Sequence, residues 1–284
     1  MQVTLHTPAT IYTARHIPSW LLLAAAPGFV NGFAFLTCQQ YVTHVTGTVT
    51  RAGLEVQNVG IAAEYLIVYV SFLVGAAAAV IVAQWRAREG CPDRWISPLF
   101  GVAMVLATVA LVGHFWAFIP IGSRSATDPP PVFLLSLLAF ASGLQNATVA
   151  STTSMSVRTT HLTGPTTDIG MLLGAAWMST GTVRRSVLAG AALRGGMVLS
   201  FAIGAALSVM TTAWAGYLAL LIPTGFVLVA GGLSFIPRWS ASDIPFSPEG
   251  APPPPPGELA GLPSDARPDE EEVRKEKADA LADR

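Results

Sequence analysis

The chain has 284 residues, of which 52% are hydrophobic and 12% charged, and its mean hydropathy is +0.53. This composition excludes an ordinary soluble domain, in which about a quarter of residues are charged, as well as a disordered chain, a disulfide scaffold and a nucleic-acid-binding protein. The net charge of −1 conceals a division, because 16 of the 33 charged residues lie in 240–284 and the preceding body carries 11 arginines against 6 acids. Long apolar runs with few charges predict a polytopic membrane protein.

Six apolar stretches are long enough to cross a bilayer, because a spanning helix needs about 20 predominantly apolar residues. In chain order they cover residues 20–38, 61–83, 98–119, 132–150, 195–213 and 214–236. The last two are contiguous, so a tight turn is expected near 211–214. Two shorter apolar segments, 46–60 and 163–180, fit half-helices, re-entrant segments or interfacial helices. We therefore predict an all-α polytopic protein with about six transmembrane helices and short half-helices.

The arginines of the membrane body are distributed unevenly among the loops between these stretches. Eight or nine of them lie near the chain ends of the body or in alternate loops, whereas the other loops hold Arg51 and Arg124. Cytosolic loops carry the excess of Lys and Arg in membrane proteins. Both termini are therefore predicted to lie in the cytosol, and the protein to be integral to the plasma membrane.

Composition divides the chain into four parts. We expect a cytosolic N-terminal segment over 1–18, a first membrane repeat over 19–125, a second over 126–239 and a tail over 240–284. The tail holds a proline run and an excess of acids, so we predict a disordered cytosolic appendage, and a docking role with a cytosolic partner stays open. The two cysteines, Cys38 and Cys91, lack metal-ligand spacing and are interpreted as small buried hydrophobes.

The two halves of the body resemble each other. The segment Thr-His-Val-Thr-Gly at 43–47 recurs as Thr-His-Leu-Thr-Gly at 160–164, which is 117 positions later. Upstream, a Gly-x-x-Asn pattern at 28–31 recurs at 143–146, and downstream the segment 71–77 recurs at 200–206. Each half has three spans, so the second half enters from the opposite side of the membrane. This predicts two inverted three-helix repeats related by a pseudo-two-fold axis in the membrane plane.

The repeated Thr-Gly motif is the predicted site. A helix that begins at Thr46 or Thr163 exposes free backbone N–H groups, which attract anions and need a partner in lipid. The expected substrate-binding residues are Thr46, Gly47, Thr163, Gly164, Asn31, Asn146, His44, His161 and Asp168. The alternative interpretation is structural: the threonines cap helices, the glycines allow close helix crossings, and Asp168 caps the helix that follows the second motif.

No catalytic or metal-binding pattern is found. The chain lacks G-x-S-x-G, H-E-x-x-H, a Walker lysine and a G-x-G-x-x-G after a strand. No carboxylate or thiolate accompanies the histidines at ligand spacing. We therefore expect no enzyme, no cofactor and no metal site.

The motifs resemble those of the YoaK-type proteins, the DUF1275 family of multi-spanning membrane proteins of bacteria and fungi. The family pattern is Gly-x-x-Asp and Thr-Gly-Asn in the first half, then Gly-x-Gln-Asn and Thr-Gly-x-x-Thr-Asp-x-Gly in the second. Here the second half reads Gly-Leu-Gln-Asn at 143–146 and Thr-Gly-Pro-Thr-Thr-Asp-Ile-Gly at 163–170. The first half departs, because Asn31 and Thr48 replace the Asp and the Asn. If the acid carries protons in relatives, this chain has lost or altered that coupling.

Two functions fit these observations. The leading expectation is a transporter or channel for a small polar solute or ion, with a site between the two repeats. The alternative is a non-transporting membrane sensor or scaffold, in which the repeated motifs serve helix packing. The expected partners are the lipid bilayer and the solute, with no nucleic acid, and a homo-oligomer stays open.

Overall fold

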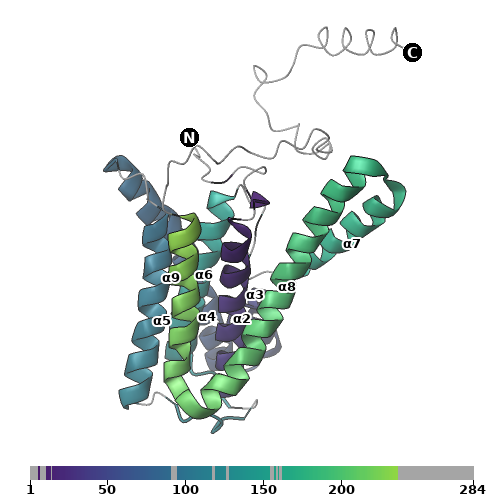
Figure 1. The fold of residues 1–284 in the computed structure, drawn as a ribbon. Helices are drawn as coiled ribbons and strands as arrows, with labels where there is room; N and C mark the ends of the chain where they lie inside the picture. The colour runs from purple at the N-terminus through teal and green to yellow at the C-terminus, as the bar shows by residue number, and fades with distance from the viewer. Residues whose placement is uncertain are drawn as a thin grey trace, which may run out of the picture. The chain divides into compact units, whose positions relative to one another are not determined.

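The computed structural model describes residues 6, 11–13, 15–90, 95–116, 119–125, 128–153, 157, 159 and 162–235. Among these residues all regular structure is helical, which confirms the predicted all-α class (Figure 1). His161, Cys91 and the tail over 240–284 lie outside the described residues. The helices are α2 (Ile17–Cys38), α3 (Val45–Leu54), α4 (Val59–Arg88), α5 (Ile96–Trp116), α6 (Val132–Thr152), α7 (Thr163–Met178), α8 (Gly181–Ala215), the 3-10 helix η1 (Gly216–Leu220) and α9 (Leu221–Ser234).

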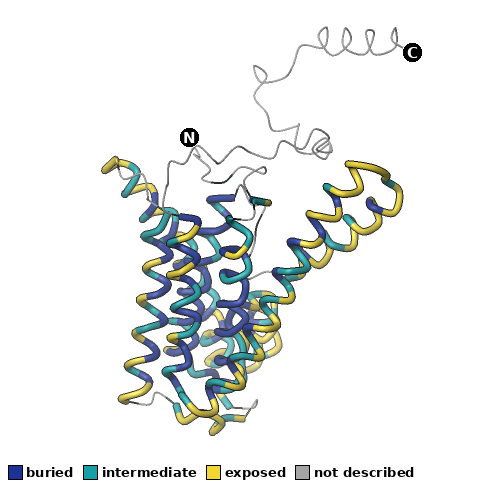
Figure 2. Tube along the Cα trace, in the orientation of Figure 1, coloured by how far each residue is buried: buried dark blue, intermediate teal, exposed yellow. Residues whose placement is uncertain are grey.

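Five segments of the described chain are long and apolar enough to cross a membrane. Four of them are α2, α4, α5 and α6, and the fifth is the 54-residue run Gly181–Ser234 that contains α8, η1 and α9. The protein is therefore an integral membrane protein with several spanning helices. Burial differs between the spans, since α2 is the most enclosed by protein and α4 the least (Figure 2).

The long fifth segment reverses direction at Gly216, later than the turn expected near 211–214. Gly216 has φ 59° and ψ −133°, a combination that glycine adopts readily and other residues do not. The preceding Thr and Ala residues continue the helix, so α8 extends to Ala215. Helix α8 begins at Gly181, so it extends 14 residues before the span expected from 195.

Helices of the first half pack mainly on helices of the second half. The most extensive contacts join α2 to α8 and α4 to α6, and α5 packs along α9. In the described part, α3 packs on α4 and α7 packs on α8, with no comparable second neighbour (Figure 1). The contact of α2 with α6 is slight. The chain therefore forms two tight helix pairs that each combine both halves.

The two tight pairs have matching crossings built on glycine. A Cβ added to Gly28 on α2 would overlap the Phe201 carbonyl of α8, and one added to Gly143 on α6 would overlap the Phe72 carbonyl of α4. These residues correspond by offsets of 115 and 129 positions. The reciprocal glycines, Gly204 and Gly75, are equally close to the backbones of α2 and α6. Both crossings therefore require a bare backbone on each helix.

Helices α5 and α9, the last helices of the two halves, run antiparallel. A Cβ on Gly231 near the end of α9 would lie 3.7–3.8 Å from Ile96 and Leu99 at the start of α5. At the opposite end, Gly113 of α5 faces the ring of Tyr217 just before α9. By contrast, α2 and α8 run parallel, as do α4 and α6, because Leu21 lies by Gly196 just as Gly28 lies by Phe201.

The residues before α2 are anchored against the ends of α6 and α9. His6 is only 3% exposed, and its backbone N–H donates to the Thr152 carbonyl at 2.9 Å. The His6 ring makes edge contacts with the rings of Trp20 and Phe235. The Trp20 indole N–H donates to the Ile11 carbonyl at 3.0 Å. Burial, followed by the neighbouring His16, lowers the pKa of His6 from 6.5 to about 4. A neutral histidine thus belongs to the packed end of the helix bundle.

The glycine crossings predict a difference between two glycine substitutions. Gly28→Ala forces a methyl group into the Phe201 backbone and should lower the free energy of unfolding by about 1–3 kcal/mol. Gly170→Ala places the same methyl in open space on α7 and should raise it by about 0.5–1 kcal/mol. Unfolding in detergent micelles measures both, and equal effects would contradict the packing argument.

His6 predicts a loss of stability on acidification. Above pH 6.5 the side chain is neutral in both states, but as the pH falls from 6.5 toward 4 the unfolded chain binds the proton first. The free energy of unfolding should fall by roughly 3 kcal/mol at most over this interval. His6→Phe keeps an aromatic ring and should show a shallower pH dependence in thermal unfolding. Parallel curves for the parent and the variant would exclude this role.

Candidate functional site

The first Thr-Gly motif forms the beginning of α3. The helix begins at Val45 with His44 at the N-cap, one residue before the expected start at Thr46. The side chains of His44 and Thr46 are exposed and Gly47 is half-buried. The His44 ring covers Gly47, since a Cβ built there would lie 2.6 Å from Nδ1.

The second motif forms the beginning of α7, where the helix begins at Thr163 as predicted. Thr163 is exposed, and Gly164 and Asp168 are half-buried. The structure does not bring the two motifs together, because α3 packs on α4 and α7 packs on α8. The expected meeting of both Thr-Gly breaks is therefore not seen among the described residues.

Asn31 positions the segment that leads to the first motif. Its Oδ1 accepts hydrogen bonds from the backbone N–H groups of Val42 and Thr43, both at 2.9 Å. The chain turns sharply between these groups, since Gln39 after α2 has a positive φ of 55°. The Asn31 carboxamide thus fixes the connection between α2 and α3, and with it the position of His44.

Asn146 occupies the equivalent position on α6, 115 residues later. Its Oδ1 is buried and has no hydrogen-bond partner in the described part of the chain. A buried oxygen without a donor is costly in an apolar setting, so such atoms usually face a backbone N–H, water or a ligand. Asn146 therefore supplies an unused buried acceptor on α6.

Gln145 connects the first helices of the two halves directly. Its Nε2 donates to the Leu23 carbonyl of α2 at 2.7 Å, in a buried setting. That carbonyl lacks its ordinary helical donor because Pro27, four residues later, has no N–H. Sequence reasoning placed Gln145 near the site but missed this bond. The proline inside an apolar run was the signal, since it frees a carbonyl that needs a partner in lipid.

Asp168 forms an ion pair and does not cap α7. Its Oδ2 accepts a hydrogen bond from Nε of Arg194 on α8 at 3.0 Å. The same guanidinium donates to the Gly190 carbonyl at 3.3 Å and to the Tyr12 hydroxyl at 3.4 Å. The sequence patterns did not predict this partner. A useful signal was that Asp168 is the sole acid between residues 129 and 242.

The arrangement offers polar recognition and charge, with no metal-ligating cluster. No group of three His, Cys, Asp or Glu residues comes together among the described residues. Cys38 is free and buried, which matches its interpretation as a small hydrophobe. The chemistry on hand is that of two carboxamides, an ion pair and helix starts. These groups can bind and orient a small polar species.

A double-mutant cycle can test the contact between Gln145 and Pro27. Gln145→Leu leaves the Leu23 carbonyl without a donor and should cost about 1–2 kcal/mol of unfolding free energy. Pro27→Ala returns a backbone N–H to that carbonyl, so Gln145→Leu should cost about 1 kcal/mol less in this background. The measurement is unfolding of all four proteins in detergent. Identical costs in both backgrounds would show that the two residues act independently.

Comparison with known proteins yields one match. The model of the family described as "Protein of unknown function (DUF1275)" matches residues 19–233. No curated protein and no solved structure matches the chain. The matched range begins two residues into α2 and ends one residue before the end of α9. The chain therefore belongs to the DUF1275 family.

Proposed function

We propose that this membrane protein moves a small polar solute or ion across the bilayer, at a site between its two halves. The proposed site lies along the seam between α2 and α6, the first helices of the halves, where Asn31 and Asn146 occupy equivalent positions. The motif residues Thr46, Gly47, His44, Thr163, Gly164, His161 and Asp168 belong to the segments that follow these two helices. These residues are also proposed to bind the solute.

The relation between the halves supports this proposal. Helices α5 and α9 hold the same place in their halves and pack antiparallel. The α2–α8 and α4–α6 crossings use equivalent residues, with the roles of the two halves exchanged. We infer six crossings in two inverted repeats, with η1 and α9 forming the sixth. Inverted repeats are common in secondary transporters, and their substrates bind near the repeat interface.

The distribution of contacts supports movement along one seam. Helices α2, α8 and α9 pack into one group, and α4, α6 and α5 into another, while the direct contact of α2 with α6 is slight. The two groups meet mainly along α5 and α9. Rocking of one group against the other about this line would open the seam on alternate sides, which is the usual mode of alternating access.

The observation that carries the proposal is the buried, unpartnered Oδ1 of Asn146, at the position on α6 that Asn31 holds on α2. An oxygen that only stabilised the fold would have a protein donor, as the Asn31 Oδ1 has in the backbone N–H groups of Val42 and Thr43. The ion pair of Asp168 on α7 with Arg194 adds a second functional candidate, because Arg194 lies in the fifth candidate span and a charge there is costly unless it is used.

Flux measurements with Asn146→Leu test the proposal. Proteoliposomes containing the full chain are shifted into hyperosmotic potassium acetate, ammonium chloride, glycine, glycerol or urea, and solute entry is followed by light scattering. We expect protein-dependent entry of at least one of these probes, reduced about tenfold by Asn146→Leu. The double variant Thr46→Val with Thr163→Val should reduce entry as well, because it removes both exposed motif hydroxyls.

Stability separates this functional role from a structural one. Leu replaces an unpaired polar group at position 146, so the variant should unfold at the same temperature as the parent or higher. Thr224→Val is the control, since the Thr224 hydroxyl of α9 donates to the Leu220 carbonyl at the end of η1, one turn earlier in the chain. The control should keep full flux. Equal flux in the Asn146→Leu and parent proteins would refute the proposed site.

A scaffold or sensor is the second candidate. It is favoured by the two tight crossings, in which Gly28, Gly75, Gly143 and Gly204 meet the backbone of the partner helix directly. It predicts no protein-dependent entry of any of the five probes.

A further inference from the structure

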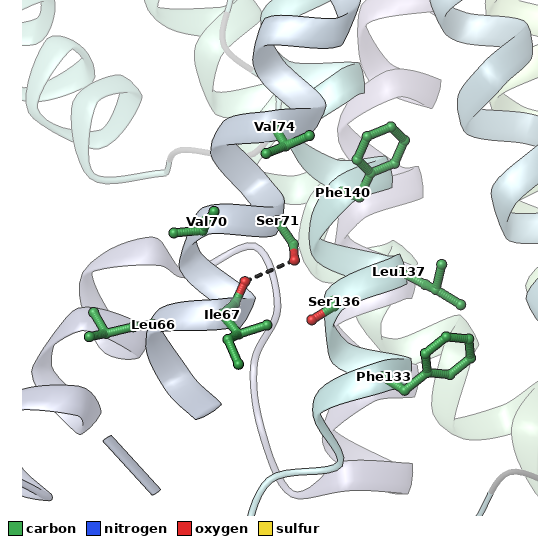
Figure 3. Close-up of a pocket in the computed structure, with 9 residues that line it drawn as sticks. All are labelled: Leu66, Ile67, Val70, Ser71, Val74, Phe133, Ser136, Leu137 and Phe140. Atoms are coloured by element: carbon green, nitrogen blue, oxygen red, sulfur yellow. Dashed lines mark hydrogen bonds between the residues drawn. The ribbon is translucent and has the colours of Figure 1, made fainter. Parts of the chain in front are cut away.

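The tight pair of α4 and α6 has a groove on its outer face. The groove has a volume of about 470 Å³, and its walls are Leu66, Ile67 and Val70 of α4 and Phe133 and Phe140 of α6 (Figure 3). Only two polar side chains, Ser71 and Ser136, line it. About half of the side-chain surface of Leu66 and Val70 is exposed, and 65% of Phe133, so the groove opens away from the protein interior.

The matching pair of α2 and α8 is filled at the same position. There Leu21 stands where α6 has Ser136, and Gly196 stands where α4 has Ile67. The Leu21 Cδ2 lies 3.2 Å from a Cβ built on Gly196, so the leucine packs directly onto the helix backbone. In the α4–α6 pair the larger residue on α4 forms a wall and the small serine on α6 leaves a hollow. The groove therefore results from one exchange of large and small residues between two like crossings.

The surroundings determine what can fill the groove. Both lining helices are long and apolar enough to span a membrane, and α4 is the span least enclosed by protein. At that depth the neighbouring medium is hydrocarbon, since water cannot satisfy exposed polar groups there. An apolar groove that opens outward on a spanning pair is thus filled by an acyl chain of a membrane lipid.

The serines place the polar end of such a lipid. The Ser71 hydroxyl donates to the Ile67 carbonyl at 2.8 Å, whereas the buried Ser136 hydroxyl has no partner in the described part of the chain (Figure 3). Ser136 lies four residues after the start of α6 at Val132, which is about 6 Å along the helix. This is a depth at which glycerol esters of lipids lie when helix starts are at the membrane surface. The free hydroxyl can donate to an ester carbonyl.

We propose that the groove between α4 and α6 is a binding site for one glycerophospholipid, with an acyl chain between Ile67 and Phe140 and its ester carbonyl at Ser136. The equivalent face of α2 and α8 binds none. This site is independent of the transport proposal, because it lies on the outer face of a tight pair and not along the seam of α2 with α6.

Photolabelling of the full chain tests the site. Proteoliposomes contain a phosphatidylcholine with a diazirine in its sn-2 acyl chain, and peptides are mapped by mass spectrometry after irradiation. We expect adducts in residues 66–74 and 133–140 and few in 195–203. Ser136→Leu reproduces the filled crossing and should reduce the groove adducts about fivefold, which corresponds to about 1 kcal/mol of binding. Ser200→Leu makes the same change on α8 and should leave them unchanged.

Two further measurements complete the test. Ser136→Ala keeps the hollow but removes the donor, so it should abolish any preference for the ester-linked probe over its ether-linked analogue. Thermal unfolding of each variant establishes that it is folded. Equal labelling of both crossings, or groove labelling that a folded Ser136→Leu protein retains, overturns the proposal. The proposal is also overturned if the groove is not labelled and a Val70→Cys variant forms cross-linked dimers, because the occupant is then a second copy of the chain.

Discussion

The close approach of helix backbones at glycine is the constraint on which the rest of the structure depends. In lipid there is no hydrophobic force between helices, so pairs form where backbones can come near enough for extensive van der Waals contact. Gly28 and Gly204 provide this for α2 with α8, and Gly75 and Gly143 for α4 with α6. Because each pair takes one helix from each half, these four residues also join the halves. Every other feature of the fold is arranged around the two pairs.

Polar side chains in this fold bind backbone groups and charges that the two tight helix pairs do not satisfy. Pro27 frees a carbonyl within α2, and Gln145 from the other half supplies its donor. Asn31 binds the backbone at the turn after α2 and holds the first short helix in place. Asp168 is neutralised by Arg194 on the helix against which α7 packs. The one equivalent group without a donor, the Asn146 oxygen, is for that reason the most informative atom for function.

Sequence patterns predicted the helices far better than the contacts between them. Apolar length gave α2, α4, α5 and α6 to within about five residues at each end, because bilayer thickness sets the length of a span. The reversal at Gly216 was expected too early in the chain, because hydropathy does not show where a long apolar run turns back. The repeat of Gly28 at Gly143 was visible in the sequence, but close helix crossing at the glycines was only the alternative interpretation. Whether two like motifs meet depends on which helices pair, and that is decided by glycines up to 176 positions apart in the sequence.

The pairing of α2 with α8 bears on how the protein is made. During synthesis α2 leaves the ribosome well before its partner α8, which follows five intervening helices in the chain. Until then the glycine face of α2 is lined by lipid or held by the insertion machinery. A ribosome that stalled between α5 and α6 would release a fragment in which neither tight pair exists. Assembly is therefore a late, post-insertion event, and neither half qualifies as an independent folding unit.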